Sequence, residues 1–263
     1  MDKKKLVVKV GTSTITNSDG SINLRSIDRL TRVLSEVESS GYKVVLVSSG
    51  AIAVGVNKMR LPGKPRETRL KQAAASVGQC ELMHLYDKFF GEYGRMAGQI
   101  LFTSDDLDNE DKRENLSGTL EALIENNIIP IINENDSISH AEIMSKDRIF
   151  GDNDMLSALV AGFVKAGKLI ILSDIDGLYD SDPHKNPDAK LVDRVEDIDS
   201  LTEDMAGGAG SARGTGGMKS KIEAARYATG IGIDVLIVNG NNPEAILDIT
   251  DHKKAGTLFV AKE

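Results

Sequence analysis

Short apolar runs recur along the chain and predict buried β-strands. Six of these runs are rich in β-branched residues and lack strict alternation, which is typical of parallel strands covered on both faces. The six runs are residues 6–10, 44–47, 99–102, 128–132, 169–172 and 235–238. A seventh run, residues 257–260, is expected to form an edge strand of the same sheet.

Between these runs, apolar residues recur at helical spacing. The helices expected from this spacing are residues 24–40, 68–93, 112–126, 156–167 and 218–229. Asn23 is a suitable N-cap for the first helix, and Gly41 is a suitable stop. Gly78 is expected to break the second helix, and Gly167 to end the fourth.

The alternation of strands and helices predicts one α/β domain over residues 1–263, a three-layer αβα sandwich with a mostly parallel central sheet. Two stretches, residues 137–150 and 177–216, depart from the pattern as excursions. In folds of this class, ligands bind beyond the carboxyl ends of the strands. The residues directly after each apolar run are therefore the candidates for function.

At two of these strand ends, a charged residue or a group of small residues lies next to backbone groups that a ligand could reach. Lys9 interrupts the first apolar run, and Gly11 allows backbone N–H groups to approach a ligand closely. A lysine whose ammonium group reaches water is an equally good explanation. After the second run, Ser49, Gly50 and Ala51 lead straight into a helix, whose N-terminus suits an anion. The alternative there is a tight turn with a serine cap, which is common.

Polar residues also gather after the fourth run and at the start of the next helix. Asn133 and Asp136 place hydrogen-bonding groups at the end of an apolar strand. Asp152, Asn153 and Asp154 open the helix that follows the first excursion. One aspartate at a helix start complements the helix dipole and needs no function, but that explanation is weaker for a whole polar cluster.

A glycine-rich loop, residues 207–217, leads into a helix with Lys219 and Lys221 in its first turn. Cations at that position oppose the helix dipole, and a bound polyanion would reverse the penalty. The loop and the helix start together are typical of a phosphate cradle. The alternative is a flexible surface loop with solvated lysines.

The amino-acid composition limits the classes of molecule that this protein is expected to bind. The 263 residues include 32 Lys and Arg against 40 Asp and Glu, a formal net charge of −8, which argues against non-specific binding to nucleic acid. A small anionic ligand remains compatible, because local positive groups outweigh a distant net charge. Cys80 is the single cysteine, so neither an intrachain disulfide nor a cysteine zinc site is possible. No apolar run approaches the roughly 20 residues that span a bilayer, and a cytoplasmic protein is expected.

The candidate residues together favour phosphoryl transfer. They comprise lysines, helix starts, a glycine-rich loop and carboxylates, without an evident Ser–His–Asp set, metal cluster or catalytic cysteine. Phosphoryl transfer depends mainly on positioning and charge neutralisation. If the acceptor is a carboxylate, it is already ionised at neutral pH and needs no general base.

In their order along the chain, these motifs resemble the amino acid kinase family, over essentially the whole sequence. They are residues 9–13 (Lys-Val-Gly-Thr-Ser), 48–52 (Ser-Ser-Gly-Ala-Ile), 132–136 (Ile-Asn-Glu-Asn-Asp), 151–154 (Gly-Asp-Asn-Asp), 173–179 (Ser-Asp-Ile-Asp-Gly-Leu-Tyr) and 214–221 (Gly-Thr-Gly-Gly-Met-Lys-Ser-Lys). Within the family, the match is to the branch that acts on L-glutamate. The resemblance implies ATP-dependent phosphorylation of the glutamate side-chain carboxylate to L-glutamyl 5-phosphate, the first step of proline biosynthesis.

The resemblance also implies roles for individual residues. Lys9 and Lys221 neutralise charge on the transferring phosphoryl group, and Asp154 organises the two lysines. The glutamate-binding residues that it implies are Ser49, Gly50, Ala51, Asn133, Asp136, Asp152 and Asn153, with Asp136 suited to the α-ammonium group. The ATP-binding residues that it implies are Lys9, Gly11, Ser173, Asp174, Thr215, Gly216, Gly217, Met218, Lys219, Ser220 and Lys221. Mg²⁺ is expected to accompany ATP, held mainly by phosphate oxygens.

The family resemblance further implies a homo-oligomer, feedback inhibition by proline, and no nucleic-acid or membrane partner. A form without the C-terminal PUA domain of many relatives is expected, which puts oligomer geometry and the details of proline feedback in doubt. Residues 137–150, next to the implied glutamate site, are the candidate regulatory loop.

Two alternatives remain open at this point. A sibling enzyme of the family would act on another carboxylate or on a nucleoside monophosphate. Residues 48–52 argue against it, because relatives acting on acetylglutamate or uridylate carry more glycine there. A non-catalytic sensor of ATP or an amino acid is disfavoured by the joint presence of Lys9, Asp154 and Lys221.

Overall fold

The centre of the molecule is an eight-stranded sheet. The computed structural model describes residues 2–138, 153–183, 185–201 and 217–262. The strands are β1 (Asp2–Val10), β2 (Lys43–Ser48), β3 (Met96–Phe102), β4 (Ile128–Glu134), β5 (Ala166–Ser173), β6 (Arg194–Val195), β7 (Asp234–Asn239) and β8 (Thr257–Phe259). Their spatial order is β3-β4-β2-β1-β5-β7-β8-β6, and every neighbouring pair is parallel except β7 and β8. The mostly parallel sheet is therefore confirmed.

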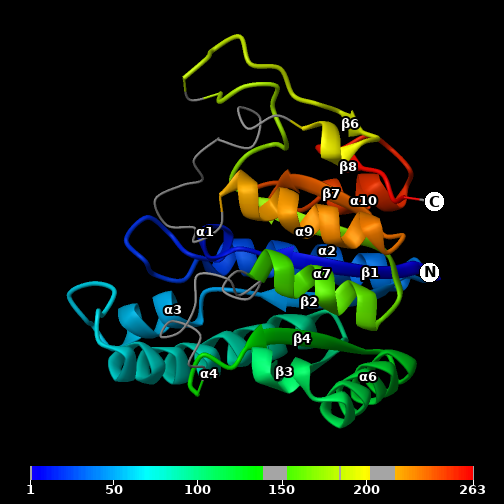
Figure 1. Ribbon diagram of the computed structural model, residues 1–263. Coiled ribbons are helices and arrows are strands. Elements are labelled where there is room, and N and C mark those ends of the chain that lie inside the picture. The colour runs from blue at the N-terminus through cyan, green and yellow to red at the C-terminus, as the bar shows by residue number, and fades with distance from the viewer. Residues whose placement is uncertain (1, 139–152, 184, 202–216, 263) are drawn as a thin grey trace.

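Helices cover both faces of this sheet, which confirms the three-layer architecture (Figure 1). One face carries α5 (Ser104–Asp108), α6 (Glu110–Glu125), α7 (Asn153–Phe163) and α9 (Met218–Gly230). The other carries α1 (Thr12–Ile15), α2 (Leu24–Ser39), α3 (Ala51–Lys58), α4 (Thr68–Glu92) and α10 (Ala245–Thr250). A short 3-10 helix, η1 (Ile198–Ser200), follows β6. Among the described helices, none combines the length and apolar character that crossing a membrane requires.

Each face of the sheet has its own apolar core, because successive strand residues point to opposite faces. In β1, Val7 belongs to the core with α7 and α9, while Val8 and Val10 belong to the core with α2 and α4. Lys9 follows Val7 by two residues, so it points toward α7 and α9. It is 6% exposed, which excludes a lysine that simply extends into water.

Helices α3 and α4 cross at two glycines, where the backbones are in close contact. A Cβ atom on Gly78 would lie 1.8 Å from the Ala51 carbonyl oxygen, and one on Gly55 would lie 1.7 Å from the Ala74 carbonyl oxygen. The expected break at Gly78 is wrong, because α4 runs without interruption from Thr68 to Glu92. The glycine serves the contact between the helices rather than the end of one.

Two further expectations at element ends are also wrong. β5 begins at Ala166, so Gly167 lies inside the strand and does not end the preceding helix. The turn is made instead by Lys165, whose φ is 53°. β8 is not an edge strand, because the two-residue strand β6, which the apolar pattern missed, pairs with it on its outer side.

Candidate active site

The predicted site residues that the structure describes gather mostly at one edge of the sheet. The strands β1, β2, β4, β5 and β7 are parallel, so their carboxyl ends share this edge. In the register of the sheet, Val10 at the end of β1 lies between Ser48 of β2 and Leu172 of β5. The helices α3 and α7 begin with residues that contact this edge. The arrangement brings the candidate residues together at the carboxyl ends of the strands, where ligands bind in folds of this class.

Asp154, in the first turn of α7, joins two lysines from different elements. Its Oδ1 atom lies 2.6 Å from Nζ of Lys9 on β1, and its Oδ2 atom lies 3.1 Å from Nζ of Lys221 on α9. The side chain of Asp154 is 0% exposed, and those of Lys9 and Lys221 are 7% and 8% exposed. We call these three residues the buried triad. Its assembly brings together all three residues expected to be catalytic.

The start of α9 explains why only one of its two candidate lysines joins the triad. Met218 and Lys221 are three residues apart and share a face of the helix, and both are buried. The side chain of Met218 packs into the apolar core. Lys219 lies on another face and is exposed to solvent.

The charge state of Asp154 follows from its surroundings. Burial disfavours the ionised carboxyl, but Lys9 and Lys221 outweigh that effect and hold the pKa of Asp154 below its ordinary value. Ser220 adds a hydrogen bond, its Oγ donating to Oδ2 of Asp154 at 3.0 Å. Asp154 is thus a fixed anion that holds two ammonium groups at the strand ends, and a carboxyl with a lowered pKa is poorly suited to accept a proton as a general base.

Asn153, the residue before Asp154, contacts the ends of two strands. Its Nδ2 atom donates to Ser49 Oγ at 2.8 Å, to Asn133 Oδ1 at 3.1 Å and to the Ser48 carbonyl oxygen at 3.2 Å. The structure therefore brings together three of the expected glutamate-binding residues, Ser49, Asn133 and Asn153. Because Asn153 and Asp154 are adjacent, one helix start contributes both to this cluster and to the buried triad.

Of the four remaining residues expected to bind glutamate, three lie in the described part of the chain. Gly50 is the N-cap of α3 with a φ of 98°, a conformation that residues with a side chain rarely adopt, and buried Ala51 begins the helix. Asp136 lies half-buried in the turn after β4, where the Asn135 N–H donates to the Phe102 carbonyl oxygen at 2.9 Å. Asp152 lies outside the described residues, as does most of the candidate regulatory loop, from residue 139 to residue 150.

The residues expected to bind ATP border the same edge. Ser173 is buried at the end of β5 and donates from Oγ to Asp174 Oδ1 at 3.3 Å. A Cβ atom on Gly11 would lie 3.6 Å from Nζ of Lys9, so the glycine leaves room beside the buried ammonium group. Gly217 precedes α9 as its N-cap and has no side chain to cap the helix. Thr215 and Gly216 lie outside the described residues.

Comparison with known proteins identifies the family of this chain. The sequence model of the amino acid kinase family matches residues 4–239. The chain belongs to the amino acid kinase family.

Similar proteins agree with this assignment. The glutamate 5-kinase of Clostridium perfringens is 55% identical over 262 residues, which is 100% of this chain and 97% of the relative. The glutamate 5-kinase of Listeria innocua is 49% identical over 262 residues, which is 100% of this chain and 95% of the relative. The structure of a carbamate kinase from Giardia lamblia bound to AMP-PNP has a TM-score of 0.69 and 17% identity, covering 99% of both chains. The amino acid kinase fold implied by the motifs is confirmed.

Two polar residues at this edge of the amino acid kinase fold were not anticipated from the sequence. Asn239 ends β7 beside Ser173 and donates from Nδ2 to Asp176 Oδ1 at 2.8 Å. The signal for Asn239 was a polar residue after an apolar run. Gln79, on α4, accepts a hydrogen bond from Asn133 Nδ2 at 2.9 Å, and its place in a long helix carried no signal.

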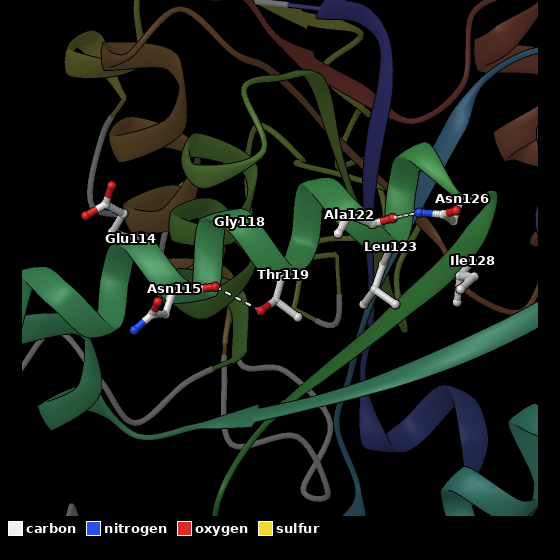
Figure 2. A pocket seen from close by; sticks show the side chains of 8 residues that line it. All are labelled: Glu114, Asn115, Gly118, Thr119, Ala122, Leu123, Asn126 and Ile128. Atoms are coloured by element: carbon white, nitrogen blue, oxygen red, sulfur yellow. Dashed lines mark hydrogen bonds between the residues drawn. The ribbon is translucent and has the colours of Figure 1, made fainter.

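A groove along α6 is separate from this site (Figure 2). It is lined by Glu114, Asn115, Gly118, Thr119, Ala122, Leu123, Asn126 and Ile128. Two of its polar side chains bind their own helix, since Thr119 Oγ1 donates to the Asn115 carbonyl at 2.9 Å and Asn126 Nδ2 to the Ala122 carbonyl at 2.7 Å. No residue expected to be functional in this amino acid kinase lines the groove.

Proposed function

We propose that this chain is an ATP-dependent kinase that converts L-glutamate into L-glutamyl 5-phosphate, the first step of proline biosynthesis. The observation that carries the proposal is the 55% identity, over the whole chain, with the glutamate 5-kinase of Clostridium perfringens. The buried triad and the neighbouring cluster around Asn153 supply the matching chemistry. A kinase acting on another carboxylate or on a nucleoside monophosphate is not favoured by these relatives.

In this reaction a side-chain carboxylate oxygen of glutamate attacks the γ-phosphorus of ATP. The new O–P bond forms as the bond from the γ-phosphorus to the β–γ bridging oxygen breaks, and ADP leaves. The carboxylate is ionised at neutral pH, so no proton has to be removed and no general base is required. The site then has to align the two substrates and neutralise negative charge in the transition state.

The buried triad suits this task. Lys9 and Lys221 bring two positive charges to one point at the strand ends, and Asp154 fixes both ammonium groups there. Positive groups held in advance in a buried site need little rearrangement when charge develops on the phosphoryl group. The cluster of Ser49, Asn133 and Asn153 lies at the same helix start and would bind the polar groups of glutamate.

Magnesium fits this site as a partner of ATP. It prefers oxygen ligands, and Ser173 and Asp174 offer side-chain oxygens at the end of β5. Its contribution when bound is to neutralise phosphate charge. Within the described ranges, His, Cys, Asp and Glu side chains form no group of three that would hold a metal ion, so phosphate oxygens and water would supply most of its ligands.

Feedback inhibition by proline, a homo-oligomeric state and a cytoplasmic location are part of the same proposal. Their support is the resemblance to the glutamate-phosphorylating branch of the family. Proline, as the end product of a route that begins with glutamyl phosphate, is the expected inhibitor of this step.

A hydroxamate assay tests the proposed function. Purified protein with ATP, Mg²⁺ and glutamate should form glutamyl hydroxamate when hydroxylamine traps the acyl phosphate, and added proline should lower the yield. A panel of acetylglutamate, carbamate and UMP, with ADP release as the readout, tests the sibling activities. No glutamate-dependent hydroxamate would contradict the proposal, and binding of ATP and glutamate without turnover would indicate a sensor.

A further inference from the structure

A chain of side-chain amides links α4 to the proposed glutamate site. Gln79 Oε1 accepts from Asn133 Nδ2 at 2.9 Å. Asn133 Oδ1 accepts from Asn153 Nδ2 at 3.1 Å, and Asn153 Nδ2 also donates to Ser49 Oγ at 2.8 Å. We call Gln79, Asn133 and Asn153 the amide chain. Gln79 is its outermost member and comes from a helix that carries none of the residues expected to be functional.

The amide chain has an anchor at each end, and the inner anchor is the carbonyl group of Ser48. The Ser48 carbonyl oxygen can only accept, and Asn153 Nδ2 lies 3.2 Å from it. Asn153 therefore turns its Nδ2 toward Ser48, Ser49 and Asn133, and its Oδ1 away from these three acceptors. Asn133 must then present Oδ1 to Asn153, which leaves its Nδ2 pointing toward α4.

Gln79 supplies the acceptor that this arrangement demands at the outer end. Asn133 is only 2% exposed, so water is a poor substitute partner for its Nδ2 group. A buried donor without a partner is costly, and a side-chain amide relieves that cost by rotating about its last torsion. If Asn133 rotated, its Nδ2 donor would face the Nδ2 donor of Asn153. Asn153 would then have to rotate as well, which would reverse the whole amide chain.

The orientation matters because the two ends of an amide have opposite hydrogen-bonding character. Glutamate at neutral pH carries two carboxylates, which accept, and one α-ammonium group, which donates. With the amide chain in the observed direction, Asn153 keeps its acceptor, Oδ1, free of Ser48, Ser49 and Asn133, all of which its Nδ2 contacts. An acceptor there suits the α-ammonium group, and a reversed amide would repel it.

We propose that Gln79 is a positioning residue for substrate recognition. By accepting from Asn133 Nδ2, it holds the amide chain in the direction that gives Asn153 an acceptor for the α-ammonium group of glutamate. This inference rests on the proposed function, since it concerns the glutamate site of that same reaction. It adds a helix, α4, to the elements that determine which substrate is bound.

Substitutions at Gln79 test this role, because they should change KM for glutamate and leave KM for ATP nearly unchanged. Gln79→Met removes the acceptor at similar size, whereas Gln79→Glu keeps an acceptor in the same place. Lys88→Met is the matched control, because Lys88 is exposed on the same helix. KM for glutamate, KM for ATP and kcat are measured in the hydroxamate assay at about pH 8, where an introduced carboxyl is ionised. Isothermal titration with glutamate gives an independent affinity.

We expect Gln79→Met to raise KM and Kd for glutamate about tenfold or more, the effect of one unsatisfied buried donor, with KM for ATP nearly unchanged. The Gln79→Glu and Lys88→Met variants should have the same KM and Kd values as the unmodified protein. Equal rises in both KM values, or a loss that Gln79→Glu does not restore, would overturn the role. If Gln79→Met does not fold, Gln79→Ala is judged by the same criteria. Unmodified protein that forms no hydroxamate would contradict the proposed function itself, whatever the variants do.

Discussion

Two clusters in this molecule have the same composition, one carboxylate between two cations, but very different surroundings. In the buried triad, Asp154 is 0% exposed, and its two lysine partners come from a strand, β1, and a helix, α9. In a second cluster, Glu244 lies 2.6 Å from Arg29 and 2.9 Å from Arg32, with these side chains 32%, 41% and 44% exposed. We call Arg29, Arg32 and Glu244 the surface triad. It joins α2 to the residue that precedes α10.

The difference shows what burial adds to a charge cluster. Burial raises the pKa of Glu244 and that of Asp154, and in each case the neighbouring cations outweigh burial and leave the pKa lowered. Water screens the surface triad, and exposed ion pairs typically contribute only about 0–1 kcal/mol. The buried triad has lost most of its hydration, so each lysine depends on Asp154 for its counter-charge, and Asp154 depends on both lysines. The same arrangement of charges therefore joins two surface elements in one place and forms a desolvated charge centre in the other.

Removal of one lysine from the buried triad should have the largest effect. We expect Lys221→Ala to lower kcat about a thousandfold, because a preorganised positive group is lost from the transferring phosphoryl group. Lys9→Ala should act similarly, and Arg29→Ala in the surface triad should leave kcat unchanged. The hydroxamate assay measures kcat, and circular dichroism checks the fold. A folded Lys221→Ala protein with unchanged turnover would refute the role.

Removal of the central carboxylate should lower the stability of the fold. Asp154→Asn leaves two buried ammonium groups without a counter-charge, and we expect the free energy of unfolding to fall by about 3–5 kcal/mol. Urea denaturation at neutral pH measures this change. If Asp154→Asn lowers the free energy of unfolding by less than the matched Glu244→Gln variant does, burial does not distinguish the two triads.

The smallest effect is expected from Glu244→Gln, which should cost about 1 kcal/mol or less at neutral pH. The pKa of Glu244 is lowered in the folded protein from an ordinary value of 4.5, so its ionised form stabilises the fold above that pH. This contribution is lost as the pH falls through the lowered value. The difference in unfolding free energy between the unmodified protein and Glu244→Gln should therefore shrink in acid. A difference that stayed constant down to pH 3 would contradict the assignment.

Most of the fold could be predicted from the sequence, because buried parallel strands leave continuous apolar runs. Every strand except β6 was found in this way, and β6 is only two residues long with a partner, β8, far along the chain. The break expected at Gly78 was wrong because its cause lies in a second helix. The contact of Gly78 with Ala51 exists only after α3 and α4 have packed together.

The members of the buried triad could be predicted where a residue conflicted with its local pattern. Lys9 stood out as a charge inside an apolar strand, and Lys221 as a cation at a helix start. Gln79 conflicted with nothing, since glutamine is an ordinary residue in a long helix. Its relevance comes from the position of Asn133 on a distant strand. Contacts between residues far apart in the sequence are thus the ones that local patterns miss.

The central place of β1 has a consequence for how the protein is made. This first strand lies between β2, which follows soon after it in translation, and β5, which begins only at Ala166. A nascent chain that has emerged as far as β4 therefore carries the apolar β1 as an open edge, the kind of surface that chaperones protect. Lys9 on that strand meets Asp154 only when α7, the helix just before β5, has been synthesised. Pairing of β1 with β5 and the first ion pair of the buried triad thus belong to the same stage of synthesis, and Lys221 joins later, with α9.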